Sequence, residues 1–134
     1  MIDLGASPII ITGSMNPDYD LVYYEHDIGS GIMLDWVIVD VCADSSCTAP
    51  FTVFYWGNAS ADTNTNIGVA GYGPPESDNQ PIPYANLWGS APYQTGIAID
   101  VDMAPAGTYQ WVRIYAPLGG PNDPAEVDAV EVLP

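Results

Sequence analysis

Thirteen glycines and thirteen prolines divide this chain into short segments, and this division constrains its fold more than any other feature of the sequence. Between them lie runs rich in Val, Ile, Tyr, Thr and Trp, which are typical of β-strands separated by turns. Apolar residues nowhere recur with the spacing of an amphipathic helix over several turns. The sequence therefore predicts an all-β protein, and strands of this number and spacing favour an antiparallel β-sandwich, or jelly roll.

Eight segments carry the strand pattern, and a short helical turn is expected at residues 83–88. The expected strands are residues 8–12, 20–25, 32–42, 51–56, 67–71, 96–103, 108–116 and 126–133. Residues 32–42 are apolar on both faces, which predicts a strand in the middle of the stacked sheets. In residues 96–103, apolar side chains ending at Met103 alternate with Ala98, Asp100 and Asp102, which predicts a strand with one face in solvent.

The charge balance excludes several classes of partner. Seventeen Asp and Glu residues face a single Arg and no Lys, so the formal net charge is −16. Nucleic-acid binding and attraction to an anionic membrane both need cationic surface, and no apolar run is long enough for membrane insertion. Self-repulsion at this charge is relieved by divalent cations, by high salt or by low pH. These three explanations of the acidity remain open.

The length of 134 residues is near the usual size of one domain, so residues 1–134 are expected to form a single β-sandwich domain. The N-terminus lacks the regions of a signal peptide, and we expect the chain to be a module of a larger extracellular protein. Cys42 and Cys47 are expected to form a local disulfide that closes a hairpin loop, with two free thiols as the alternative. A disulfide favours a secreted or cell-surface protein.

Four segments occur in an order that resembles a known family. They are residues 17–25, residues 37–41, the Tyr-Gln-Trp-Val-Arg-Ile run at 109–114, and the closing Glu-Val-Asp-Ala-Val-Glu run at 126–131, which follows Asp123. Together they resemble a jelly-roll domain of large secreted and cell-surface bacterial proteins, over nearly the whole chain. The resemblance implies a galactose-binding-like β-sandwich, an architecture whose members often bind calcium and sometimes bind sugars. It implies no defined activity.

Carboxylates on the opening and closing strands form the first candidate site. Asp20 and Glu25 bracket one expected strand, and Asp128 shares a strand face with apolar residues, so we expect it to point inward. A buried carboxylate has to be paired, hydrogen-bonded or bound to a metal. Arg113 is the one permanent side-chain cation, so we expect a structural ion pair with an acidic residue, Glu25 or Asp128 being the leading partners. An ion pair that fixes sheet register and a metal site stay equally open for these carboxylates.

The segment Asp-Thr-Asn-Thr-Asn-Ile-Gly at residues 62–68 forms the second candidate site. Asp62, Asn64 and Asn66 place oxygen donors at every second position, and calcium prefers six to eight oxygen ligands. The segment begins like an EF-hand loop, but Ile67 stands where that loop needs Gly, and no Glu closes it. One interpretation is a calcium loop of another kind, helped by distant carboxylates. The other is a turn in which Asn and Asp side chains bond to their own backbone.

Aromatic residues in the expected loops form the third candidate site. Trp56, Tyr72, Trp88 and Tyr93 are candidate carbohydrate-binding residues, because sugar sites combine exposed aromatic faces with polar side chains. The competing interpretation is that these rings close the core of the sandwich and send their polar ends to solvent.

The residues favour a non-catalytic protein. His26 is the only His, and the chain has no nucleophile elbow and no phosphate-binding glycine loop. We therefore expect an extracellular structural or interaction module stabilised by calcium, with glycans or other surface proteins as partners. A carbohydrate-binding module is the alternative. A self-assembling surface or filament subunit is a third hypothesis, because the chain has no Lys to guard its strand edges.

Overall fold

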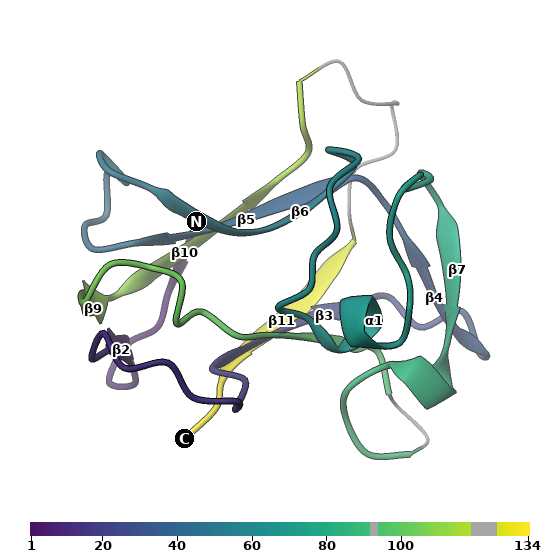
Figure 1. The fold of residues 1–134 in the computed structure, drawn as a ribbon, viewed down its shortest axis with the longest axis horizontal. Coiled ribbons are helices and arrows are strands. Elements are labelled where there is room, and N and C mark those ends of the chain that lie inside the picture. The colour runs from purple at the N-terminus through teal and green to yellow at the C-terminus, as the bar shows by residue number, and fades with distance from the viewer. Residues whose placement is uncertain (92–93, 119–125) are drawn as a thin grey trace.

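The computed structural model describes residues 1–91, 94–118 and 126–134, and it shows two stacked antiparallel sheets (Figure 1). The first sheet contains β1 (Ile2–Asp3), β10 (Trp111–Tyr115), β5 (Val37–Cys42) and β6 (Phe51–Trp56), in that order. The second contains β11 (Val127–Val132), β3 (Leu21–Glu25) and β8 (Gly96–Ile99). The expected all-β antiparallel sandwich is therefore confirmed.

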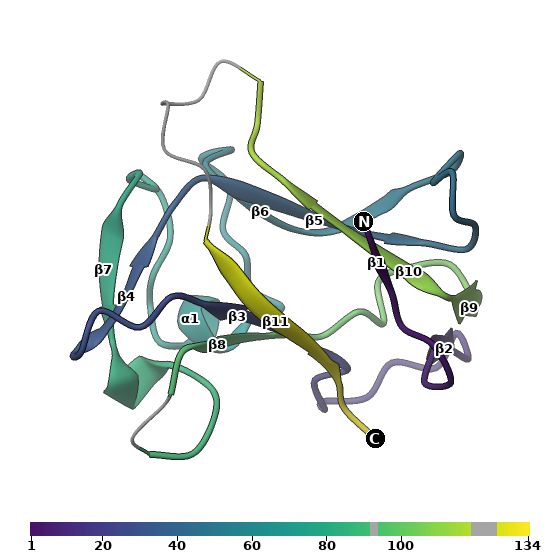
Figure 2. The ribbon, with the colours of Figure 1, turned by 180° about the vertical axis from the view of Figure 1, so that it is seen from behind.

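Two strand pairs lie at opposite ends of the stack (Figure 1). One is β2 (Ile9–Ile11) with β9 (Gly107–Tyr109), and the other is β4 (Gly31–Leu34) with β7 (Gln80–Pro83). The chain moves from the second sheet to the first between β3 and β5, returns before β8, and crosses again before β10, which is the alternation of a jelly roll. Figure 2 shows β11 as the outer strand of the second sheet.

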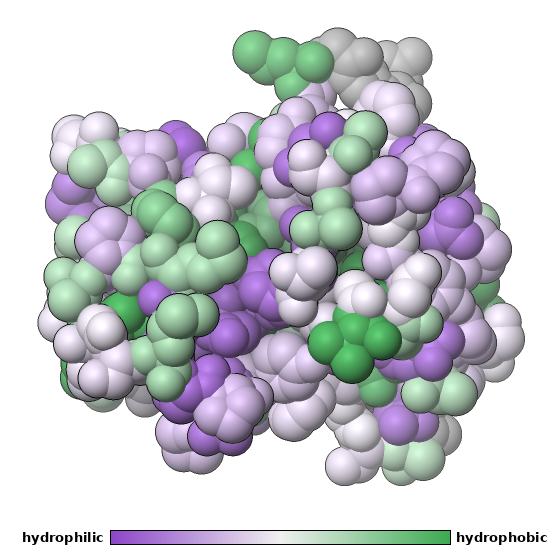
Figure 3. All heavy atoms as spheres, viewed as in Figure 1, coloured by the Kyte–Doolittle hydropathy of each residue, from purple (hydrophilic) through white to green (hydrophobic). Residues whose placement is uncertain are grey.

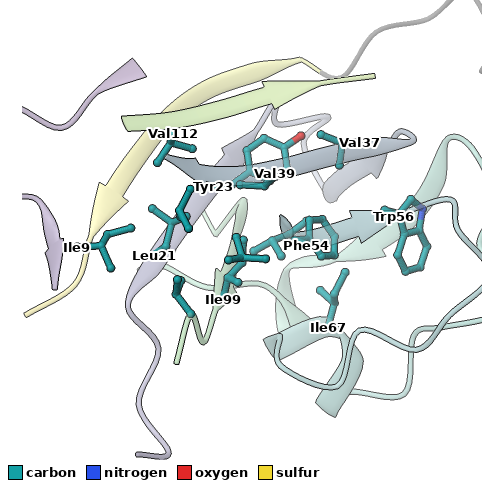
Figure 4. Packing of buried hydrophobic residues seen from close by; sticks show 14 of the residues in the cluster. Ile9, Leu21, Tyr23, Val37, Val39, Phe54, Trp56, Ile67, Ile99 and Val112 are labelled. Atoms are coloured by element: carbon teal, nitrogen blue, oxygen red, sulfur yellow. The ribbon is translucent and has the colours of Figure 1, made fainter. Parts of the chain in front are cut away.

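The core fills the space between the two sheets (Figure 4). Leu21, Tyr23 and Ile99 enter it from the second sheet, and Val39 and Phe54 enter it from the first; all are at most 1% exposed. Each fully buried aliphatic or aromatic side chain stabilises the fold by about 1.5–3 kcal/mol. The alternating apolar residues seen in the sequence therefore supply the main attraction between the layers.

The segment 32–42 lies in the interior as expected, but it forms two strands. β4 and β5 are separated at Asp35 and Trp36. There the backbone N–H of Trp36 donates to Asp78 Oδ1 (3.2 Å), and its indole N–H donates to the Glu76 carbonyl (3.3 Å). These bonds to residues 76–78 replace the ladder that a continuous strand would make.

The prediction of a strand at 67–71 is wrong, because this segment begins with the short helix α1 (Asn66–Val69). Thr65 caps the helix, its hydroxyl oxygen accepting the backbone N–H of Gly68 at 3.0 Å. Ile67 still reaches the core and is fully buried. A short apolar run between polar residues carries too little periodicity to distinguish one helical turn from a strand.

The prediction that one face of residues 96–103 lies in solvent is also wrong for the part of the segment that forms a strand. β8 ends at Ile99, and Ala98 is as fully buried as Ile97. The outer face is covered by α1, where Asn66 Oδ1 accepts the backbone N–H of Ala98 at 2.7 Å. Met103 lies beyond the strand and is 64% exposed. The alternation of apolar and polar residues mispredicts which side chains are exposed, because the helix that covers β8 comes from a distant part of the sequence.

Other differences are local. The segment 108–116 forms β9 and β10, and the short strands β1 and β7 were not expected. β7 pairs only with β4, and it tolerates two prolines because they remove donors on an outer strand. The expected helical turn at 83–88 is confirmed as the 3₁₀ turn η1 (Tyr84–Asn86).

Asp128 is exposed, contrary to the inward orientation expected for it. The register between β11 and β3 shifts between Val127 and Ala129, where a bulge interrupts the alternation of side chains. Asp128 therefore needs no buried partner.

Cys42 and Cys47 form the expected disulfide, which closes the connection between β5 and β6.

None of the helices among the described residues is long and apolar enough to cross a membrane.

Arg113 pairs with Asp40, and not with Glu25 or Asp128. The two residues lie directly opposite each other on β10 and β5. Arg113 donates to Asp40 Oδ2 through Nη2 (2.6 Å) and Nε (3.0 Å), while the Thr52 hydroxyl donates to Oδ1 at 2.6 Å. Asp40 is 1% exposed, whereas the Arg113 side chain is 34% exposed. The pair therefore fixes the register of the first sheet around a buried carboxylate.

Replacing Arg113 by Met is expected to destabilise the protein by about 3 kcal/mol, because it leaves the Asp40 carboxylate buried without its cation. Urea denaturation measures the change. The double variant Arg113→Met with Asp40→Leu should recover part of the loss, because it removes the buried charge as well. A loss below about 1 kcal/mol for Arg113→Met would show that the pair behaves as an exposed salt bridge.

Candidate metal centre

Three aspartates gather at the end of the β3–β8 pair. Asp20 directly precedes β3, and Asp100 and Asp102 directly follow β8. Because Leu21 pairs with Ile99 in the antiparallel register, Asp20 and Asp100 are brought to the same end of the sheet. One carboxylate oxygen from each of the three residues lies within 4.8 Å of the others. We refer to Asp20, Asp100 and Asp102 as the aspartate triad.

Backbone N–H groups orient each carboxylate of the triad through one oxygen. Val101 N donates to Asp20 Oδ2 (2.8 Å), Asp102 N donates to Asp100 Oδ1 (2.9 Å), and Asn16 N donates to Asp102 Oδ2 (2.6 Å). The second oxygen of each carboxylate accepts no hydrogen bond from the described residues. Backbone groups therefore hold the three carboxylates in place, and no side-chain cation among the described residues pairs with them.

Like charges make this arrangement unfavourable without a counter-ion. Partial burial raises the pKa of Asp20, and the negative charges of Asp102 and Asp100 raise it further. A calcium ion prefers hard oxygen ligands and accepts backbone carbonyls and water to complete its shell. The triad has the donor chemistry for such an ion, at a partly exposed position that water can reach.

The sequence identified one member of this centre and missed two. Asp20 was expected to bind metal, but Asp100 and Asp102 were assigned only to a solvent face. The signal was present in the Asp-Val-Asp sequence at 100–102, which puts two carboxylates two residues apart. What the sequence lacked was the β3–β8 register that brings Asp20 to them.

The segment 62–66 does not assemble as the expected calcium loop. The Asn64 amide donates to the carbonyls of Val53 and Asp100, both at 2.9 Å. The Asn66 amide donates to Asn86 O (2.8 Å), and its oxygen accepts the backbone N–H of Ala98. Both amides therefore join chain segments, which matches neither the calcium loop nor a turn bonded only to itself.

Asp62 takes no part in these amide hydrogen bonds and instead interacts with Glu76. Burial, followed by the charge of Glu76, raises the pKa of Asp62 to about 7. Asp62 Oδ2 and Glu76 Oε1 are both buried and have no hydrogen-bonding partner among the described residues. No sequence pattern connects these two residues, which come from different loops.

Glu25 lies at the opposite end of β3 from Asp20, and so the two do not share a site. Its carboxyl group is 1% exposed, and neither oxygen makes a well-formed hydrogen bond within the described part of the chain. Burial raises the pKa of Glu25 to about 8, and the charge of Asp35 adds to the effect. The backbone N–H groups of His26 and Glu126 oppose it only in part.

The expected carbohydrate-binding residues do not form one exposed platform. Trp56 is 1% exposed, and its indole N–H donates to Ser77 O at 2.9 Å. Tyr72 is half-buried, and its hydroxyl accepts from the Asn86 amide at 3.2 Å. Trp88 is 38% exposed and packs edge-on against Tyr19, with ring centroids 5.6 Å apart. Tyr93 lies outside the described residues.

The chain was compared with protein-family models, with curated proteins and with solved structures, and none of them matches it. What the protein does has to be inferred from its own residues and their geometry.

The stability of the protein is expected to fall as the pH rises from about 4.5 to about 8, because Glu25 titrates across this range. Its pKa is raised on folding, so the folded state keeps a proton that the unfolded state releases, and stability present at low pH is lost as the pH rises through the folded pKa. The slope contributed by one such group approaches about 1.4 kcal/mol per pH unit.

Urea denaturation as a function of pH measures this slope. Glu25→Gln should flatten it, because glutamine does not titrate, whereas the exposed Asp128→Asn should leave it unchanged. An unchanged slope in Glu25→Gln would show that Glu25 is ionised at ordinary pH in the folded protein.

Proposed function

We propose that this chain is a non-catalytic extracellular structural or interaction module that calcium stabilises at the aspartate triad. The observation that carries the proposal is the geometry of Asp20, Asp100 and Asp102, whose carboxylate oxygens converge within 4.8 Å. An ion at this position would connect the start of β3 to the end of β8 and would place two positive charges beside three of the seventeen acidic groups. Its role would be structural, because it joins segments of the fold.

Several features support an extracellular setting. The Cys42–Cys47 disulfide is a bond that persists in oxidising compartments. The two-layered sandwich is an architecture common to surface modules, and the galactose-binding-like relationship is part of this proposal. Other surface proteins or glycans are the proposed partners. The burial of Trp56 favours an interaction module over a carbohydrate-binding one, because a buried indole cannot stack on a sugar.

Calcium is expected to raise the free energy of unfolding, because it binds the folded state and finds no assembled site in the unfolded chain. At a calcium concentration one hundred times Kd, one site contributes about 2.7 kcal/mol. Thermal or urea unfolding followed by circular dichroism, in calcium and in chelator, measures the change.

Two matched variants make this test specific. Asp102→Asn and Asp128→Asn each remove one negative charge, but only the first alters the triad. The calcium effect should be smaller in Asp102→Asn by about 1.4 kcal/mol or more, which corresponds to a tenfold loss of affinity. An equal effect in the two variants, or an equal effect of sodium chloride at matched ionic strength, would contradict the proposal, because it would show general screening of charge.

A further inference from the structure

We propose that Asp62 and Glu76 form a second divalent-cation site, between the loop that follows β6 and the loop that precedes β7. The inference deepens the proposed calcium-stabilised role and rests on it for the choice of ion, but it concerns residues separate from the aspartate triad. Asp62 lies between β6 and α1, and Glu76 lies between α1 and β7. The two carboxyl groups lie close enough for the charge of Glu76 to raise the pKa of Asp62.

Backbone N–H groups lie against both carboxyl groups, and one oxygen of each carboxyl group has no hydrogen-bonding partner among the described residues. Glu76 Oε2 accepts the backbone N–H groups of Gly57 (2.6 Å) and Ala59 (3.2 Å). The backbone N–H of Tyr55 lies against the Asp62 carboxyl group. Glu76 Oε1 and Asp62 Oδ2 are buried and have no hydrogen-bonding partner among the described residues. Metal ligands are commonly held in this way, by an outer shell of backbone groups.

Gly57 makes the anchoring of Glu76 possible. Its φ of +111° belongs to the left-handed region that favours glycine, and a Cβ at this position would lie 2.8 Å from the Trp36 ring. A larger residue would therefore push the loop away from Trp36, and the N–H groups that hold Glu76 would move with it. The loop conformation and the orientation of the Glu76 carboxylate depend on each other.

A positive charge between the two residues would relieve their mutual repulsion. Glu76 is 8% exposed, and two ionised carboxylates close to each other repel more strongly when one of them is shielded from water. One shared proton would bond the two unsatisfied oxygens to each other but would leave a net negative charge. A divalent cation would coordinate both oxygens and neutralise both charges, in a chain whose only guanidinium is bound to Asp40.

Solvent can reach the Asp62 side of the site and supply further ligands. Asp62 lines an open hollow of about 200 Å³, together with Asn58, Asn64 and Asp100, whereas Glu76 does not line it. Figure 3 shows hydrophilic residues near the middle of the face that is viewed as in Figure 1. Waters entering such a hollow can complete the coordination of an ion that the protein holds through two carboxylates.

Two tryptophans beside the site provide a direct readout. The Trp36 indole N–H donates to the carbonyl of Glu76 (3.3 Å), and the Trp56 indole N–H donates to the carbonyl of the next residue, Ser77 (2.9 Å). Terbium occupies calcium sites, and a nearby excited indole sensitises its luminescence. Terbium bound by Asp62 and Glu76 is therefore expected to emit when tryptophan is excited, and calcium should displace it.

The test is made in the Asp102→Asn variant, because terbium at the triad would be sensitised by Trp88, which packs against Tyr19 beside Asp20. Asp102→Asn should still emit, since the triad is a different site. Adding Asp62→Asn with Glu76→Gln to this variant should reduce the emission at least about tenfold, because both charged ligands are lost. Near-ultraviolet circular dichroism verifies that the variants fold, and in chelator the double variant Asp62→Asn with Glu76→Gln should be at least as stable as the wild type, because it removes the repulsion.

Emission from Asp102→Asn that survives when Asp62→Asn and Glu76→Gln are added, or that is absent from Asp102→Asn itself, would overturn the inference. So would a wild-type chain that gives no emission while its stability rises on acidification and that of the double variant does not, because a shared proton would then satisfy the pair. The proposed function fails by a different result, namely calcium stabilisation that is the same in Asp102→Asn and Asp128→Asn. The two proposals can therefore fail independently.

Discussion

The bond between Arg113 and Asp40 sets the electrostatic condition for the rest of the fold. It places the only guanidinium of the chain on one buried carboxylate, in the middle of the first sheet. No other side chain in the sequence carries a permanent positive charge. Every other carboxylate that folding buries has to be stabilised by backbone N–H groups, by a proton or by a cation from solvent.

The described carboxylates meet this condition in three ways. At the aspartate triad, backbone N–H groups orient one oxygen of each residue, and the proposed ion would balance the negative charge. At Glu76, backbone N–H groups hold Oε2, while Glu76 Oε1 and Asp62 Oδ2 are buried without a hydrogen-bonding partner among the described residues. At Glu25, burial favours the protonated form. Two of the three explanations of the acidity, divalent cations and low pH, would then apply at different sites, because each carboxylate responds to its own surroundings.

Local sequence patterns correctly predicted the strands whose burial does not depend on an additional covering segment. β3, β5 and β6 lie where their apolar runs placed them, and the Cys42–Cys47 bond follows from the short separation along the chain. The same patterns failed wherever a distant segment supplied the contact. α1 covers the outer side of β8, so Ala98 is buried, and the bulge in β11 turns Asp128 outward. Residues 76–78 hold Trp36, so one expected strand became two.

The sequence by itself determined the fold class, the disulfide and the strongly negative net charge, because turn residues, β-branched runs, cysteine spacing and charged residues are properties of the chain alone. Only the tertiary structure decided which acidic residues meet. Asp20 and Asp100 are eighty residues apart in the chain and adjacent through the β3–β8 register, and Asp62 meets Glu76 because two loops pack against Trp36 and Trp56. Charge repulsion acts through distance in space, and strand register, which long-range packing fixes, sets that distance.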